Sequence, residues 1–198
     1  MLPLKNVIAA RIRPDVQAMH AYAIADAHDM VKLDAMENPH GLPPELQAEL
    51  GQRLGSVALH RYPAGRINDL RRALADYTKI PDGFALMLGN GSDELISLLA
   101  LVGALAPDAS NGFKKAVVLA PVPGFVMYAM SAQLQGLDFV GVPLTADFEL
   151  DESAMLQAIA AHQPAITYLA FPNNPSANLW CDQTIEKIIL AADLHGGL

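Results

Sequence analysis

A glycine-rich turn at residues 88–94, LGNGSDE, joins a predicted strand to a predicted helix. The first turn of a helix presents N–H groups without partners and the positive end of the helix dipole, so this turn could bind a phosphate. It is not a dinucleotide fingerprint, because Glu94 replaces the third glycine of G-x-G-x-x-G and no Walker lysine follows. Taken alone, the segment equally fits an ordinary strand-to-helix turn capped by Ser92.

An aromatic residue, Phe125, lies in segment 120–128, APVPGFVMY, which also follows a predicted strand and opens a helix. It would lie just beyond the carboxyl end of the strand, where open α/β sheets bind ligands, and its ring could stack on a flat cofactor. The alternative is packing, since Phe125 and Tyr128 are three residues apart on one helix face. This segment alone favours packing.

Two adjacent asparagines, Asn173 and Asn174, lie between prolines in segment 169–178, LAFPNNPSAN. The residue before a proline is held in an extended conformation, so this stretch is rigid. A rigid amide can donate a hydrogen bond to an oxygen anion on a ring. Asn-Pro is also common in plain turns, so the segment does not by itself specify a ligand.

The three segments are more informative together, because each follows a predicted parallel strand. The carboxyl ends of such strands meet at one edge of the sheet, which would bring the phosphate-binding turn, the aromatic ring and the amide donor into one site. A phosphate cradle, a stacking ring and a donor to a ring oxygen match pyridoxal 5'-phosphate (PLP). The sequence therefore predicts a PLP site at this edge.

Short apolar runs alternate with helical apolar spacing, which is typical of an α/β domain with a mainly parallel sheet. Strands are predicted at residues 85–88, 116–119, 139–142 and 166–169, and helices at 44–54, 68–77, 93–105, 125–134, 152–161 and 183–194. Asp151 and Asp182 are predicted helix N-caps, and Gly196-Gly197 a helix stop. Residues before about Pro44 carry prolines and one short helical stretch at 19–27, which indicates an arm laid against something else.

Composition excludes several classes of function. The 198 residues are 52% hydrophobic, enough to bury a core, and carry a formal net charge of -8 with no cluster of Lys and Arg, so nucleic-acid or anionic-membrane binding is not expected. No secretory signal is found, nor an apolar run near the roughly 18 residues of a membrane span, so a cytoplasmic location is expected. The single cysteine, Cys181, is expected to be a buried or inert thiol.

Other common site chemistries are not indicated. No metal is predicted, because metal-ligand spacing is missing among the six histidines, which are His20, His28, His40, His60, His162 and His195. Neither a G-x-S-x-G elbow nor a Cys/His pair suggests nucleophilic hydrolysis. A nicotinamide-type α/β protein would need the third glycine and an acidic residue at ribose distance.

Five segments, in order and spacing, resemble the N-terminal half of the histidinol-phosphate aminotransferase family of fold-type I PLP enzymes. They are 33–41 (LDAMENPHG, like the family's L-x-A-N-E-N-P-x-G arm), 61–63 (RYP), 90–94, 123–128 and 172–177 (PNNPSA, like P-N-N-P-T-G). The resemblance implies a three-layer α/β/α large domain with a mainly parallel sheet. It implies an N-terminal arm at 1–43 and an incomplete PLP-binding large domain at 44–198, with the small domain absent.

The resemblance also implies cofactor-binding residues. Gly91, Ser92 and Asp93 would bind the PLP phosphate through their backbone N–H groups. Phe125 would stack on the pyridine ring, and Asn174 would donate a hydrogen bond to the phenolic oxygen.

Further contacts would be made to the substrate and to a second subunit. Tyr62 would act in trans in a homodimer, on the phosphate of the neighbour's cofactor, while Tyr22 and Asn38 would contact the substrate. The implied substrates are an imidazole-bearing phosphate ester with an amino group and 2-oxoglutarate/glutamate. Departures from the family pattern blur substrate identity; they are Met36 for the usual Asn, Phe125 for a frequent Tyr, and Ser176-Ala177 for Thr-Gly.

No residue can be assigned the catalytic role. In the family, the Schiff-base lysine, the acid beside the ring nitrogen and the arginine that binds the substrate carboxylate come after a segment like 191–198. Family motifs surround none of the lysines present, which are Lys5, Lys32, Lys79, Lys114, Lys115 and Lys187. An inactive fragment of a normal enzyme is expected. The alternatives are a non-catalytic binding or assembly module and a relative of phosphothreonine decarboxylase.

The resemblance also predicts a gap in the sheet. In fold-type I enzymes later strands lie between the first and the fourth, so residues 85–88 should not pair directly with 166–169. Such a gap would expose backbone groups and apolar helix faces. Expressed alone, the chain is expected to aggregate or to be partly molten.

Overall fold

The computed structural model describes residues 3–20, 26, 28–32, 37–62, 67–103, 105–108 and 112–198. The chain divides into two compact units: Met1–Ala35 with Gly91–Leu198 form the first, and Met36–Asn90 form the second. All strands that the structure describes belong to the first unit. Within the described residues, no helix is both long enough and apolar enough to span a membrane.

A parallel sheet forms the centre of the first unit, in the order β4-β3-β5. Its strands are β3 (Val117–Val122), β4 (Asp138–Pro143) and β5 (Ile166–Thr167), which confirms the apolar runs predicted as the second, third and fourth strands. Successive side chains of a strand point to opposite faces, so Val118 and Leu119 of the central strand enter different cores.

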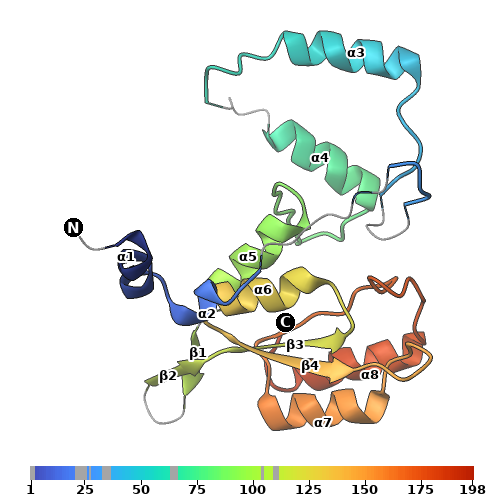
Figure 1. The fold of residues 1–198 in the computed structure, drawn as a ribbon. Coiled ribbons are helices and arrows are strands. Elements are labelled where there is room, and N and C mark those ends of the chain that lie inside the picture. The colour runs from blue at the N-terminus through green and yellow to red at the C-terminus, as the bar shows by residue number, and fades with distance from the viewer. Residues whose placement is uncertain are drawn as a thin grey trace. The chain divides into compact units, whose positions relative to one another are not determined.

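Helices cover both faces of this sheet, which gives the predicted three layers (Figure 1). α6 (Val126–Gln135) packs on one face with α5 (Ser92–Val102) against it, and α7 (Glu152–His162) and α8 (Asp182–Asp193) cover the other. The buried core under α7 and α8 consists of Leu119, Val142, Leu150, Met155, Ile159, Trp180 and Ile188. The core under α6 consists of Ala116, Val118, Ala132, Leu137 and Ile166.

The ends of α7 and α8 follow local capping chemistry. Asp151 caps α7 as predicted, because its carboxylate accepts a hydrogen bond from the N–H of Ala154 at 2.9 Å. The prediction that Asp182 caps α8 is wrong: Cys181 is the N-cap, and Asp182 is the first helical residue, where its charge complements the helix dipole. Cys181 is exposed, so a buried thiol is also wrong. Gly196, at φ +70°, turns the chain after α8 and confirms the predicted stop.

A short antiparallel hairpin follows α5 and was not expected from the sequence pattern. It pairs β1 (Leu105–Asp108) with β2 (Gly112–Lys115). The helix predicted at 93–105 therefore ends too late, since α5 stops at Val102. Pro107 has no N–H to donate within a helix, and strands of four residues show too little alternation to be recognised.

The second unit contains α3 (Pro44–Gly55) and α4 (Ile67–Thr78), both predicted to within one residue of these ends. The strand predicted at 85–88 is wrong: residues 84–89 have no regular secondary structure, and Phe84 and Met87 are exposed. An apolar run becomes a strand only where a neighbour completes its backbone hydrogen bonds, and the described part of the chain pairs no strand with it.

Two helices near the N-terminus were not predicted, α1 (Leu4–Arg11) and α2 (Pro14–Gln17). The eight residues of α1 make only about two turns, which is too short for a periodic pattern to stand out in the sequence. The helix predicted at 19–27 is wrong at its described residues, because Met19, His20 and Asp26 are not helical. The rest of this predicted helix lies outside the described parts of the chain.

Arg13 holds this N-terminal segment to α6. Its guanidinium donates to the carbonyl oxygens of Gln133 at 2.8 Å and Leu134 at 3.0 Å, and it pairs with Asp15. The last carbonyls of a helix have no partner within it, and a cation there complements the dipole. The segment thus lies against the end of a helix that belongs to the sheet unit.

Replacing Arg13 should loosen this attachment. In the whole protein, we expect Arg13→Met to speed amide hydrogen exchange in residues 13–17 and in the last turn of α6, measured by mass spectrometry. Arg53→Met is the matched control, because its guanidinium pairs with Glu49 within α3. Exchange in α6 that is as slow in Arg13→Met as in the unmodified protein would contradict the attachment.

An ion pair links α7 to α8. The Glu152 carboxylate accepts hydrogen bonds from Nζ of Lys187 at 2.7 Å and from Oγ1 of Thr184 at 2.9 Å. The bond from Lys187, and after it the bond from Thr184, lowers the pKa of the Glu152 carboxyl. A lowered pKa stabilises the fold above the ordinary carboxyl pKa, and this contribution is lost as pH falls through the lowered value.

Glu152→Gln should therefore reduce the acid-side fall in the thermal unfolding midpoint of the whole protein. The effect should be small, because the Lys187 side chain is exposed and that of Glu152 is only partly buried. Glu45→Gln on α3 should leave the pH profile unchanged, because the described residues include no ion-pair partner for Glu45. Superimposable profiles for Glu152→Gln and the unmodified protein would show that the pair contributes nothing.

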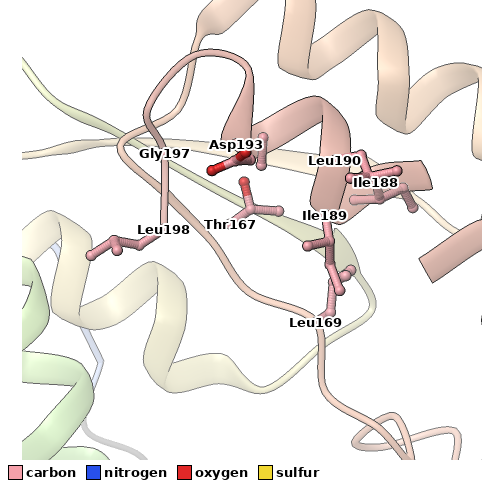
Figure 2. Close-up of a pocket in the computed structure, with 9 residues that line it drawn as sticks. Thr167, Leu169, Ile188, Ile189, Leu190, Asp193, Gly197 and Leu198 are labelled. Carbon is pink, nitrogen blue, oxygen red and sulfur yellow. The ribbon is translucent and has the colours of Figure 1, made fainter. Parts of the chain in front are cut away.

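The outer edge of β5 is only partly covered. Leu198 lies beside it, since its N–H donates to the Ala165 carbonyl at 3.0 Å and its carbonyl accepts from the Thr167 N–H at 2.8 Å. Among the described strands, β5 pairs with β3 and not with residues 85–88. The resemblance implies that these two segments do not pair directly. A mainly apolar cavity of about 240 Å³ lies beside this edge, and its lining residues are Thr167, Leu169, Ile188, Ile189, Leu190, Ala192, Asp193, Gly197 and Leu198. Figure 2 shows how these side chains lie.

Candidate functional site

Three of the predicted segments face one edge of the sheet. The strands β3 and β5 are parallel, so the loops that follow them start from the same edge. The far end of α5 lies near the opposite edge: a Cβ on Gly103 would be 3.5 Å from Cδ1 of Ile166, the first residue of β5. The N-terminus of α5 therefore points toward the carboxyl edge, where the two loops begin.

The N-terminus of α5 is open. Gly91 is its N-cap, at φ +80° and ψ 179°, and as a glycine it has no side chain with which to cap the helix. The alternative of a turn capped by Ser92 is therefore wrong, because Ser92 is already the first helical residue. A Cβ built on Gly91 would have nothing within 4 Å, so the Cβ side of this N-cap is open. This geometry suits an anion such as a phosphate.

Phe125 is the N-cap of α6 and is half-buried. The preceding Gly124 makes a turn that only glycine fits, because a Cβ there would lie 2.5 Å from the Pro121 carbonyl oxygen. The Phe125 ring meets the Tyr128 ring edge to face, with centroids 5.5 Å apart and planes at 87°. Phe125 thus packs against Tyr128, as the alternative interpretation expected. This contact leaves Phe125 half-buried at the start of α6 rather than in the core.

A second aromatic contact supports this pair. Tyr128 stacks on Tyr168, which follows β5, with centroids 4.2 Å apart and planes at 3°. Burial raises the pKa of both phenols, and the Tyr128 charge adds to the effect on Tyr168, so both remain protonated near neutral pH. The sequence did not single out Tyr168, because it reads as part of a strand.

The loop after β5 places its two asparagines differently. Asn174 is half-buried, and within the described residues its side-chain amide has no hydrogen-bond partner. Asn173 is 1% exposed, and its amide donates to Ser176 Oγ at 2.7 Å and to the Pro123 carbonyl at 3.3 Å. The amide left available for a ligand is therefore that of Asn174, while Asn173 ties the loop to its neighbour.

The remaining predicted residues belong to other parts of the chain. Tyr62 and Asn38 lie in the second unit; Tyr62 is 97% exposed, and Asn38 Oδ1 accepts a hydrogen bond from the His40 N–H at 3.0 Å. Tyr22 lies outside the described residues. Gly91, Ser92, Asp93, Phe125 and Asn174 all belong to the first unit.

Two of the lysines in the described residues are engaged with carboxylates. Lys115 and Lys187 form ion pairs with Asp138 and Glu152. In the described ranges, no cluster of three or more His, Cys, Asp or Glu side chains is arranged to hold a metal.

Comparison with known proteins identifies the family. Residues 28–198 match the family model described as aminotransferase class I and II. The chain belongs to this family. The nicotinamide-type alternative is thereby excluded, and the resemblance found in the sequence is confirmed.

Relatives and solved structures of this aminotransferase family agree. The chain is 70% identical over 187 residues to the histidinol-phosphate aminotransferase of Polaromonas naphthalenivorans (strain CJ2), covering 94% of this chain and 49% of that protein. For the histidinol-phosphate aminotransferase of Acidovorax sp. (strain JS42) the identity is 66% over 189 residues, covering 96% and 49%. The chain spans about half the length of the curated relatives it matches.

A solved aminotransferase shares the fold. The crystal structure of histidinol-phosphate aminotransferase from Sinorhizobium meliloti in complex with pyridoxal-5'-phosphate superposes with a TM-score of 0.68 at 21% identity, covering 92% of this chain and 48% of that one. The predicted fold class, that of fold-type I PLP enzymes, is confirmed.

Proposed function

We propose that the whole protein is a PLP-dependent aminotransferase that moves an amino group between histidinol phosphate and the 2-oxoglutarate/glutamate pair, in histidine biosynthesis. One observation carries the proposal. An uncapped helix N-terminus, an aromatic ring and an available amide face one sheet edge, in a chain 70% identical to a histidinol-phosphate aminotransferase.

The residues fit PLP on three counts. The N–H groups of Gly91, Ser92 and Asp93 would hold its phosphate, since the Cβ side of this N-cap is open. Phe125 would cover one face of the ring and exclude water from it. Asn174 would donate to the phenolic oxygen, which favours the anionic form of that oxygen and lowers its pKa. When bound, PLP would supply an electron sink for bond changes at the amino-bearing carbon of the substrate.

A homodimer is part of the proposal. Tyr62, which is 97% exposed, would reach the phosphate of PLP in the neighbouring subunit. Tyr22 and Asn38 would contact the phosphate-bearing amino substrate. The protein would act in the cytoplasm without nucleic acid or membrane partners.

The proposal also assigns parts of the chain. Residues 1–43 would form the arm and 44–198 the first part of the PLP-binding domain. The lysine that binds PLP covalently, and the acid beside the ring nitrogen, would come from the part of the relatives' length that this chain does not span.

Steady-state assays of the whole protein test the proposal. With histidinol phosphate and 2-oxoglutarate, glutamate should form, and the rate should fall after removal of PLP and recover when it is added back. Phosphothreonine should release no carbon dioxide. Decarboxylation of phosphothreonine without glutamate formation from histidinol phosphate would favour the decarboxylase relative instead.

A non-catalytic binding or assembly module remains the second candidate, because no lysine in this chain carries a family motif. The same protein preparation separates the two. PLP bound without any turnover, and with a spectrum insensitive to replacement of the whole protein's lysines, would favour the module. Turnover that depends on one lysine would exclude it.

A further inference from the structure

Asn173 is the buried asparagine of the loop after β5. It is 1% exposed, and its Nδ2 donates both to Ser176 Oγ at 2.7 Å and to the Pro123 carbonyl at 3.3 Å. Its backbone N–H donates to the Asn178 carbonyl at 3.1 Å, which closes the loop on itself. The side-chain amide of Asn173 therefore both braces its own loop, through Ser176, and joins it to the loop after β3, through Pro123.

The hydrogen bonds continue from Asn173 to a third loop. Ser176 Oγ donates to Asn178 Oδ1, and Asn178 Nδ2 donates to the Phe148 carbonyl at 2.8 Å. The same carbonyl accepts from Nε1 of the buried Trp180 at 3.0 Å. Phe148 lies between β4 and α7. One series of side chains thus joins the loops that follow β3, β4 and β5.

We propose that Asn173 is a positioning residue for PLP, acting through Asn174 and Phe125. The inference rests on the proposed function. Asn174 follows Asn173 directly, and Pro123 lies two residues before Phe125. The buried amide of Asn173 therefore fixes the position of the Phe125 ring relative to the Asn174 amide. A buried amide whose N–H groups are both bonded is held in place, and a site gains affinity when its groups are held before the ligand arrives.

A double-mutant cycle in the whole protein tests this role. The variants are Asn173→Ala, Asn174→Ala and the two combined, and the readouts are the PLP dissociation constant and the pH at which the visible absorption of bound PLP changes. Asn173→Ala should weaken PLP binding by about tenfold and move that pH upward, in the same direction as Asn174→Ala. In the Asn174→Ala background it should weaken binding less, by about threefold or below, because only its effect through Phe125 remains.

Equal effects of Asn173→Ala in both backgrounds would overturn the proposal, because a merely structural role would act on both alike. Asn68→Ala, which removes an exposed amide from α4, is the control and should change neither readout. If Asn173→Ala does not fold, Ser176→Ala tests the proposal instead. It should move the pH of the absorption change upward by a smaller amount, and this shift should disappear when Asn174→Ala is also present.

The two proposals fail in different ways. A whole protein that binds no PLP overturns both. A protein that binds PLP and transaminates, yet shows independent effects of Asn173 and Asn174, keeps the proposed function and loses the positioning role.

Discussion

Expressed by itself, the 198-residue chain should aggregate or remain partly molten. The cause is the apolar surface beside β5 and along α8. Ile189, Leu190 and Leu198 are 56%, 57% and 76% exposed there, although they line a cavity together with the buried Ile188 (Figure 2). An apolar surface next to an open strand edge favours association between chains.

Size-exclusion chromatography with light scattering, together with binding of a hydrophobic dye, measures this outcome. The chain alone should elute largely as aggregate and bind dye, whereas the whole protein should do neither. Ile189→Glu should reduce aggregation of the chain, while Leu179→Glu, at a position 62% exposed before α8, should not. A monodisperse chain that binds no dye and unfolds cooperatively would contradict the expectation.

Gly91→Ala should weaken PLP binding to the whole protein by roughly 5- to 150-fold, since strain of about 1–3 kcal/mol corresponds to that range. At φ +80° and ψ 179°, Gly91 has a backbone conformation open essentially only to glycine. An alanine must either bear this strain or rotate the N–H groups away from the phosphate. Titration of the apoprotein with PLP measures the change.

A second positive-φ glycine provides the control. Gly136, at φ +77°, ends α6 before β4 begins, and so lies at the opposite edge of the sheet. Gly136→Ala should lower stability without weakening PLP binding once the protein is folded. Equal loss of PLP affinity in the two variants would show that Gly91 acts only through stability.

Much of the first unit could be predicted because its signals are local. The helices α6, α7 and α8 are marked by apolar spacing, and Asp151 and Gly196 by capping chemistry. The strand at 85–88 could not be judged correctly, because an apolar run shows no sign of whether a partner strand is present. The hairpin after α5 and the helix α1 lack clear periodicity, so both were missed.

Part of the candidate site could likewise be predicted from the sequence, and part could not. Phe125 and Asn174 could be placed from the rule that ligands bind beyond the carboxyl ends of parallel strands. The roles of Asn173 and Tyr168 could not, because neighbouring residues of one loop differ only in the direction of their side chains. The sequence gives both asparagines the same setting between two prolines, whereas the structure buries one and leaves the other available.

A crystal structure of the whole protein with PLP bound would show directly whether these three segments form the PLP site. We expect the phosphate within hydrogen-bond distance of the backbone N–H groups of Gly91, Ser92 and Asp93. We also expect the Phe125 ring parallel to the pyridine ring, and Asn174 Nδ2 at the phenolic oxygen. PLP bound elsewhere, or a phosphate held only by side chains of other elements with Asn174 turned away, would contradict it.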